Sequence, residues 1–152
     1  MEQHSVAIFV GNEEKTFMIS VNADVGRAIA MSLRGEKSER PLTHELMAHV
    51  FSAFEIRVER VVINELRSNT YYARLILRAE NEVHKKFIEI DARPSDCLAL
   101  ALQAKAPVYV SRDVWEEVED MSELLEKMKE SGGGKKKPDP PEEEPPLFGE
   151  DA

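Results

Sequence analysis

The sequence predicts an α+β fold, a mixed, largely antiparallel sheet packed with helices in a single compact domain. Segments with alternating apolar and polar residues, typical of half-buried strands, are interleaved with segments whose apolar residues recur every three or four positions, typical of helices. Turn residues join several strands directly, which favours antiparallel pairing. Two similar strand–turn–helix units, residues 19–33 and 88–102, complete the prediction.

The expected strands alternate in polarity and end at turn residues. Gly11-Asn12-Glu13-Glu14 separates the first two, Ser68-Asn69 fits a tight hairpin, and Asn81-Glu82 makes another turn. Strands are expected over residues 5–10, 16–21, 56–66, 70–78, 86–91 and 107–110.

The expected helices have recognisable beginnings or ends. Gly35 ends the first, Thr43 is the expected N-cap of the second, and Pro94 begins the third. Helices are expected over residues 22–34, 44–54, 94–105, 113–119 and 122–129. The second carries one apolar stripe, made of Leu46, Met47, Val50, Phe51 and Phe54.

The two similar units align at a constant offset of 69 residues without a gap. Ile19 and Val21 align with Ile88 and Ile90, and Asn22-Ala23 aligns with Asp91-Ala92. Two like units in one core suggest an approximate twofold axis.

Composition divides the chain of 152 residues into three parts. The net charge of −9 is distributed as −1 over residues 1–110, −5 over residues 111–130 and −3 over residues 131–152. We expect a domain over residues 1–120, a charged helix over 121–130, and a disordered Gly-, Lys-, Pro- and Glu-rich tail over 131–152. Proteins that bind nucleic acid nonspecifically usually carry an excess of Lys and Arg, which this near-neutral domain lacks. A local basic patch can still occur in a domain of this net charge.

No apolar run reaches the roughly 18 residues that a membrane-spanning helix needs. The N-terminus has no secretory signature, and the single Cys97 excludes an internal disulfide. These observations predict a cytoplasmic protein that does not associate with membranes. Cys97 lies among Ile, Leu and Ala residues and is expected to pack as a small apolar side chain.

Two polar segments, residues 40–46 and 91–96, adjoin the beginnings of two predicted helices. If they meet in space, His44 can act as general acid or base, carboxylates can hold a divalent cation, and arginines can grip a phosphodiester. The candidates are Arg40, His44, Glu45, Asp91, Arg93 and Asp96.

Structural roles remain open for each of them. Asp96 and Glu45 lie where a helix dipole favours a carboxylate, Asp91 and Arg93 can pair with each other, and His44 can be an ordinary surface histidine. The chain contains no HExxH, CxxC pair, GxSxG, P-loop or dinucleotide fingerprint.

Five segments in order resemble the bifunctional nuclease (BFN) domain family, once a domain of unknown function. They are RPLTHEL (40–46), VERVVINEL (58–66), TYYARLIL (70–77), IDARPSDCLALAL (90–102) and APVYVS (106–111). The resemblance spans roughly residues 5–118 and implies a compact α+β fold with nuclease activity on DNA and RNA in some members. Such chemistry implies a dependence on Mg²⁺ or Mn²⁺, since the ion would neutralise developing phosphate charge.

The resemblance implies roles for the same six candidates. His44, Glu45, Asp91 and Asp96 would be catalytic, Arg40 and Arg93 would contact phosphate, and Glu45, Asp91 and Asp96 would bind metal.

This chain departs from the family pattern in its first unit. Members usually have Leu-Pro-Ile-aromatic-Ile-Gly where this chain has residues 17–22, and a Glu before an Ala where it has Val25-Gly26. An Asp often stands where Glu45 is. The leading hypothesis is a DNA- and RNA-hydrolysing nuclease domain. The alternative is a noncatalytic homodimeric interaction or regulatory module that binds a partner protein or a small anion.

Overall fold

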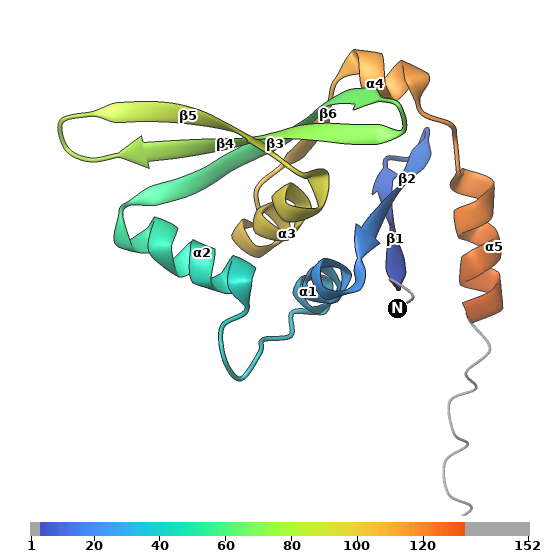
Figure 1. Ribbon diagram of the computed structural model, residues 1–152, viewed down its shortest axis with the longest axis horizontal. Helices are drawn as coiled ribbons and strands as arrows, with labels where there is room; N and C mark the ends of the chain where they lie inside the picture. Colours follow the sequence, from blue (N-terminus) through green and yellow to red (C-terminus); the bar gives the residue numbers. More distant parts are fainter. Residues whose placement is uncertain (1–3, 133–152) are drawn as a thin grey trace, which may run out of the picture.

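The computed structural model describes residues 4–132 as two sheets and five helices. Figure 1 shows α1, α2 and α3 on one side of the larger sheet, with the β1–β2 hairpin at one end of it. The strands are β1 (Ser5–Gly11), β2 (Thr16–Asn22), β3 (Ile56–Arg67), β4 (Thr70–Glu80), β5 (Lys85–Ala92) and β6 (Val108–Val110). The helices are α1 (Ala23–Arg34), α2 (Thr43–Ala53), α3 (Pro94–Ala104), α4 (Arg112–Glu117) and α5 (Ser122–Gly132).

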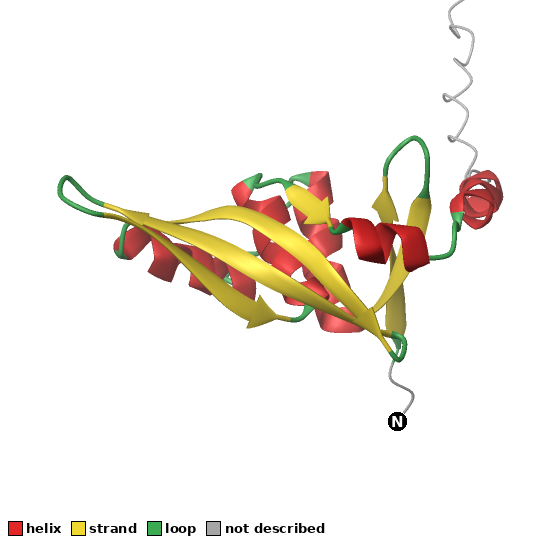
Figure 2. Ribbon diagram, turned by 90° about the horizontal axis from the view of Figure 1, so that it is seen from above, coloured by secondary structure: helices red, strands yellow, loops and turns green. Residues whose placement is uncertain are grey.

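The predicted α+β class is confirmed, with the strands divided between two sheets. β1 and β2 form an antiparallel hairpin of their own, and the other four strands form a sheet of order β5-β4-β3-β6. All pairs are antiparallel except β3 with β6. Seen from above, the long, twisted β3–β4–β5 ribbons form one layer and the helices another (Figure 2). The sheet thereby supplies a continuous surface on which the site-bearing helices pack.

The core lies mainly between β3, β4 and α3 and extends to β2 and α1. Alternate residues Val61 and Ile63 of β3 are fully buried, as is Ala73 of β4, because the two-residue period of a strand turns every second side chain to the helices. α3 is buried from Cys97 to Ala101 and is therefore apolar nearly all round. At its N-terminus Pro94 is also buried, but Arg93, Ser95 and Asp96 remain accessible, which leaves polar side chains for a site.

The two similar units are both present as a strand followed by a helix, and α1 packs against α3. Their strands lie in different sheets, because β2 pairs with β1 whereas β5 pairs with β4. Their turns also differ. Asn22 is the N-cap of α1, but the aligned Asp91 is still within β5, and α3 begins only at Pro94. The aligned turns are therefore not equivalent in structure.

The Val25-Gly26 departure from the family pattern lies where β1 crosses α1. Gly26 is buried, and a Cβ added to it would lie 2.8 Å from Cβ of Val6. Val25 packs against the hydrophobic core. The first unit thus uses this position for close packing and presents no carboxylate there.

The apolar stripe predicted for α2 is only partly buried. Met47 and Phe51 pack on the core, whereas Leu46, Val50 and Phe54 are 56%, 46% and 73% exposed. The stripe is divided in this way because α2 packs mainly on α3 and β3 and turns its remaining apolar residues to solvent. The prediction that Thr43 is the N-cap is wrong, since Thr43 is the first helical residue and Leu42 precedes it as N-cap.

The C-terminal helices attach to the β1–β2 hairpin. The Lys15 ammonium donates to the Trp115 carbonyl at 2.7 Å, and the Met121 N–H donates to the Thr16 carbonyl at 2.6 Å. α5 continues to Gly132, three residues beyond its predicted end, and the rest of the predicted tail lies outside the described residues. None of the helices in residues 4–132 is long and apolar enough to cross a membrane.

Candidate active site

The first turn of α3 carries two of the predicted site residues in direct contact. Arg93 is the N-cap and Pro94 begins the helix with the fixed φ that suits this position. The Arg93 Nε donates to the Asp96 Oδ2 at 2.8 Å. Asp96 lies three residues after Arg93, which is the spacing at which helical side chains meet.

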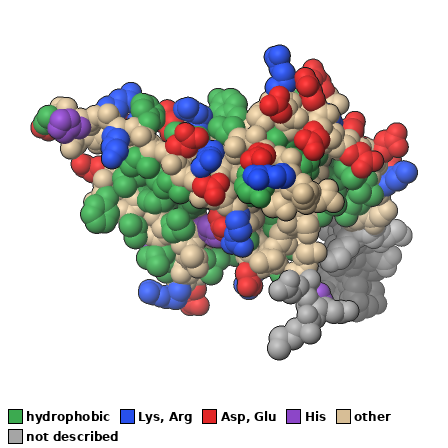
Figure 3. All heavy atoms as spheres, turned by 45° about the horizontal axis from the view of Figure 1, so that its top comes forward, with side chains coloured by type: hydrophobic (Ala, Val, Ile, Leu, Met, Phe, Trp, Pro, Cys, Tyr) green, Lys and Arg blue, Asp and Glu red, His purple; other side chains and the backbone are tan. Residues whose placement is uncertain are grey.

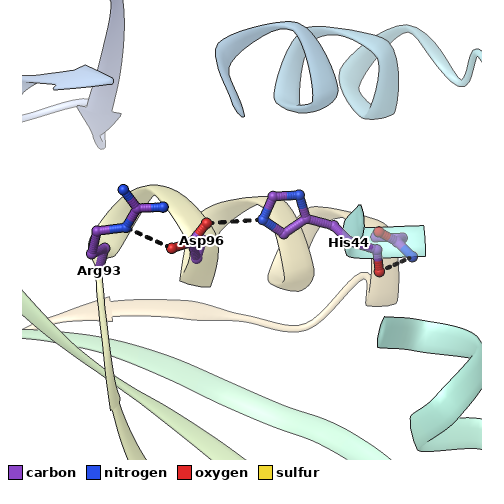
Figure 4. A network of polar contacts seen from close by, with 4 residues as sticks. His44, Arg93 and Asp96 are labelled. Carbon is purple, nitrogen blue, oxygen red and sulfur yellow. Dashed lines mark hydrogen bonds and ion pairs between the residues drawn. The ribbon is translucent and has the colours of Figure 1, made fainter. Parts of the chain in front are cut away.

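His44 of α2 completes a chain of three polar side chains (Figure 4). Its Nε2 lies 3.0 Å from Asp96 Oδ1, and the imidazole donates this hydrogen bond because an ionised carboxylate can only accept. His44 is buried, with only 11% of its side chain exposed, so its interpretation as an ordinary surface histidine does not hold. A hydrogen-bonded, oriented imidazole beside a carboxylate is an arrangement suited to proton transfer.

Gln103 holds the backbone of His44 from the same helix that carries Asp96. Its Nε2 donates to the His44 carbonyl at 3.1 Å. Asp96 and Gln103 are separated by seven residues, close to two helical turns, so both lie on the face of α3 that meets α2. We did not predict this residue, because a single glutamine in an apolar helix carries no recognisable motif.

The charge of Asp96 is maintained by its two donors. Partial burial of Asp96 opposes ionisation, but the hydrogen bonds from Arg93 and His44 outweigh burial, so the pKa of this carboxyl lies below its ordinary value. Asp96 is therefore an anion at neutral pH and stabilises a positive charge on either neighbour.

The remaining predicted site residues have other partners. The Glu45 Oε2 accepts the Leu42 N–H at 2.7 Å, so this carboxylate caps α2. Asp91 is exposed on β5, with its Oδ1 3.8 Å from Nη1 of Arg74. The Arg40 side chain is exposed in the loop before α2 and forms no hydrogen bond or ion pair with other residues in the range 4–132. The structure thus brings together His44, Arg93 and Asp96.

A metal held jointly by Glu45, Asp91 and Asp96 does not fit this arrangement. Divalent cations need several oxygen ligands converging on one point, whereas these three carboxylates face a helix cap, a strand arginine and a histidine. Across the described chain no three His, Cys, Asp or Glu side chains are grouped to hold an ion.

A cleft of about 770 Å³ opens beside Arg93. One wall is β2, another is the end of the β3–β4 hairpin, and the N-terminus of α3 contributes Arg93, Pro94 and Ser95. The remaining wall is acidic, with Glu117 and Glu119. An anion entering the cleft therefore meets one arginine and the positive end of the α3 dipole on one side, and two carboxylates on the other.

Tyr71 lines the same cleft at the end of the hairpin. Burial raises the pKa of its hydroxyl, with a further contribution from the negative charge of Glu117. Its ring lies 5.6 Å from that of Phe17, which packs in turn against Trp115. The cleft is thus lined by two aromatic residues, Phe17 and Tyr71, which no single segment of the sequence reveals because they come from β2 and β4.

A family model describing the bifunctional nuclease domain matches residues 7–123, most of the described chain. The chain belongs to the bifunctional nuclease domain family. An uncharacterized Mycobacterium tuberculosis protein, Rv1829, is 33% identical over 103 residues, covering 68% of this chain and 58% of that protein. This bifunctional nuclease domain therefore spans less than two thirds of that relative's length.

Two rice proteins named bifunctional nucleases are also similar. Bifunctional nuclease 1 of Oryza sativa subsp. japonica is 30% identical over 84 residues, which is 55% of this chain and 25% of the rice protein. Bifunctional nuclease 2 of the same plant is 23% identical over 113 residues, 74% of this chain and 34% of the rice protein. The family predicted from the five segments is confirmed.

Proposed function

We propose that this bifunctional nuclease domain hydrolyses phosphodiester bonds in DNA and RNA, using His44 as the general base. The hydrogen-bonded chain from Arg93, which lines the cleft, through Asp96 to the more deeply placed His44 is the observation that carries the proposal. Membership of the family and the names of the rice relatives support it.

Each member of the chain has one role. Because the His44 Nε2 proton is directed to Asp96, the lone pair of the neutral ring is at Nδ1. Nδ1 takes a proton from the attacking water, whose oxygen bonds to phosphorus as the ester oxygen leaves. Asp96 stabilises the imidazolium that forms.

Arg93 positions the phosphate. Its Nε is bound to Asp96, which leaves the terminal guanidinium nitrogens to hold two phosphate oxygens. The α3 N-terminus adds the favourable end of its dipole to the same site. Arg40, Glu45 and Asp91 are proposed to contribute to catalysis from a greater distance. The cleavage assay tests whether Mg²⁺ or Mn²⁺ is required.

The test is cleavage of end-labelled single-stranded DNA and RNA by the purified full chain, with Mg²⁺, with Mn²⁺ and with EDTA. His44→Ala should lower the rate by about 10²–10⁴-fold, as expected for loss of a general base. The matched control is His49→Ala, which removes an exposed histidine from the same helix and should leave the rate unchanged. Equal cleavage by wild-type protein and His44→Ala would exclude His44 as the general base.

A noncatalytic module that binds a small anion or a partner protein is the second candidate. It is favoured by Val25 at the position of the family glutamate and by the acidic wall of the cleft. This function predicts no cleavage under any metal condition, together with binding of inorganic phosphate that calorimetry detects and Arg93→Ala abolishes.

A further inference from the structure

The outer edge of β5 is a long, regular strand edge that no other described strand pairs. Among residues 4–132 only β4 pairs with β5, and it does so over the whole of Lys85–Ala92 without a bulge. The opposite edge of β5 therefore carries unpaired backbone donors and acceptors. Exposed strands normally protect such edges with charged side chains, proline, bulges or a covering element, and β5 has charged side chains but no proline and no bulge. Phe87 and Ile90 of this strand are 52% and 41% exposed.

The sequence of β5 is complementary to itself when reversed. Lysines occupy its beginning and carboxylates its end: Lys85 and Lys86 precede Phe87 and Ile88, and Glu89 and Asp91 follow. In an antiparallel pair, the beginning of one strand lies opposite the end of the other. Opposite charges facing each other stabilise such a pair, whereas like charges destabilise it.

We propose that two copies of this chain associate by antiparallel pairing of their β5 edges, joining the two four-stranded sheets into one continuous sheet. A twofold axis passes through Ile88, which lies opposite Ile88 of the second copy. Lys85 of each copy then faces Asp91 of the other, Phe87 faces Glu89, and the methylene stem of Lys86 covers Ile90.

Two alternative registers are less favourable. In an antiparallel pair, facing residues point to the same side of the sheet, and side chains alternate between the two sides along each strand. The twofold axis can therefore move from Ile88 to a neighbouring residue, but not to a point between two residues. With the axis at Glu89, two like charges face each other, Glu89 opposite Glu89 of the second copy. With the axis at Phe87, only residues 85–89 of β5 are paired, whereas the proposed register pairs residues 85–91.

The apolar face of α2 is the competing surface. Figure 3 shows hydrophobic side chains gathered over the half of the molecule that holds α2 and the β4–β5 hairpin. Leu46, Val50 and Phe54 contribute exposed side chains from α2. Nothing on that helix specifies what covers it, whereas β5 carries both an unpaired backbone edge and a self-complementary charge pattern.

The first test measures the mass of the full chain by light scattering and sedimentation over a range of concentrations. We expect twice the 17.2 kDa of one chain. Lys85→Glu and Asp91→Lys should each weaken the dimer about tenfold by opposing like charges twice, and the double variant should restore it. Lys86→Glu, an equal change of charge facing an apolar residue, is the control and should have a smaller effect.

The second test fixes the register by disulfide formation. Ile88→Cys places two thiols opposite each other across the axis, within the Cα separation that a disulfide requires. Mild oxidation should convert this variant to a covalent dimer, while the wild type and Glu89→Cys stay monomeric in denaturing gels. A monomer at all concentrations, crosslinking through Glu89→Cys in place of Ile88→Cys, or dissociation by Val50→Glu with no effect of Lys85→Glu would overturn the proposal.

Discussion

His44 and Asp96, fifty-two residues apart in the chain, are joined by a 3.0 Å contact between the imidazole Nε2 and a carboxylate oxygen. The contact connects α2 with α3 and is mostly shielded from water. Asp96 also accepts from Arg93, so it is satisfied on both oxygens. Removing the carboxylate charge should therefore affect stability and chemistry together.

Asp96→Asn should lower the free energy of unfolding at pH 7 by about 1–3 kcal/mol, because two charge-assisted hydrogen bonds lose their acceptor charge. Since the folded pKa of Asp96 is depressed, its contribution is present above the ordinary aspartate pKa and is lost as the pH falls through the folded pKa. The difference between wild type and variant in urea unfolding should shrink from pH 7 to about pH 3. A difference independent of pH would contradict the assigned ionisation.

Arg93→Ala should raise KM for an oligonucleotide by roughly tenfold or more, since a charged hydrogen-bond donor to phosphate is lost. Arg93→Lys should recover only part of the affinity, because an ammonium cannot bind Asp96 and two phosphate oxygens with one planar group. Arg27→Ala removes an exposed arginine from α1, away from the cleft lining, and serves as the control. Steady-state kinetics distinguish the variants, and equal KM values for Arg93→Ala and Arg27→Ala would exclude phosphate contact.

Gln103→Leu should lower the free energy of unfolding by about 0.5–1.5 kcal/mol, because the His44 carbonyl loses a donor while the side-chain volume is nearly kept. If Gln103 also positions the histidine, the cleavage rate should fall at saturating substrate with little change in KM. Urea unfolding and kinetics on the same preparation separate the two effects. Loss of stability with an unchanged rate would restrict Gln103 to a structural role.

Gly26→Ala should destabilise the protein by about 1–3 kcal/mol, although alanine normally favours a helix over glycine. The new Cβ would meet the branched side chain of Val6 at 2.8 Å. Combining it with Val6→Ala should remove most of the clash, so a double-mutant cycle should show favourable coupling between the two changes. Additive effects would show that β1 and α1 separate easily.

Cys97 should be inert to thiol reagents at pH 8 in the native protein. Burial raises its pKa to about 12, with smaller contributions from the negative charges of Asp96 and Asp91. Because only the thiolate reacts, labelling should await unfolding, and its rate should rise with urea as the unfolded fraction does. Rapid labelling without denaturant would indicate local opening of α3.

Strand and helix positions were largely predictable, because hydrophobic periodicity and turn residues are local properties. The bounds of the four long helices and of the strands agree with the predicted bounds to within a few residues. Periodicity did not reveal that Leu46, Val50 and Phe54 face solvent, because a helix's apolar stripe indicates where it can be covered and not how much partner surface lies there. It also did not reveal that the two similar units belong to different sheets.

The sequence by itself determined the α+β class, the family and the six polar candidates, since each depends on residues close together in the chain. Only the tertiary structure decided which candidates act together. Packing of α2 against α3 brings His44 to Asp96 and Gln103, whereas Glu45, next to His44 in sequence, turns to the cap of its own helix. Neighbouring residues on a helix point in directions about 100° apart, so adjacency in sequence does not imply a shared site.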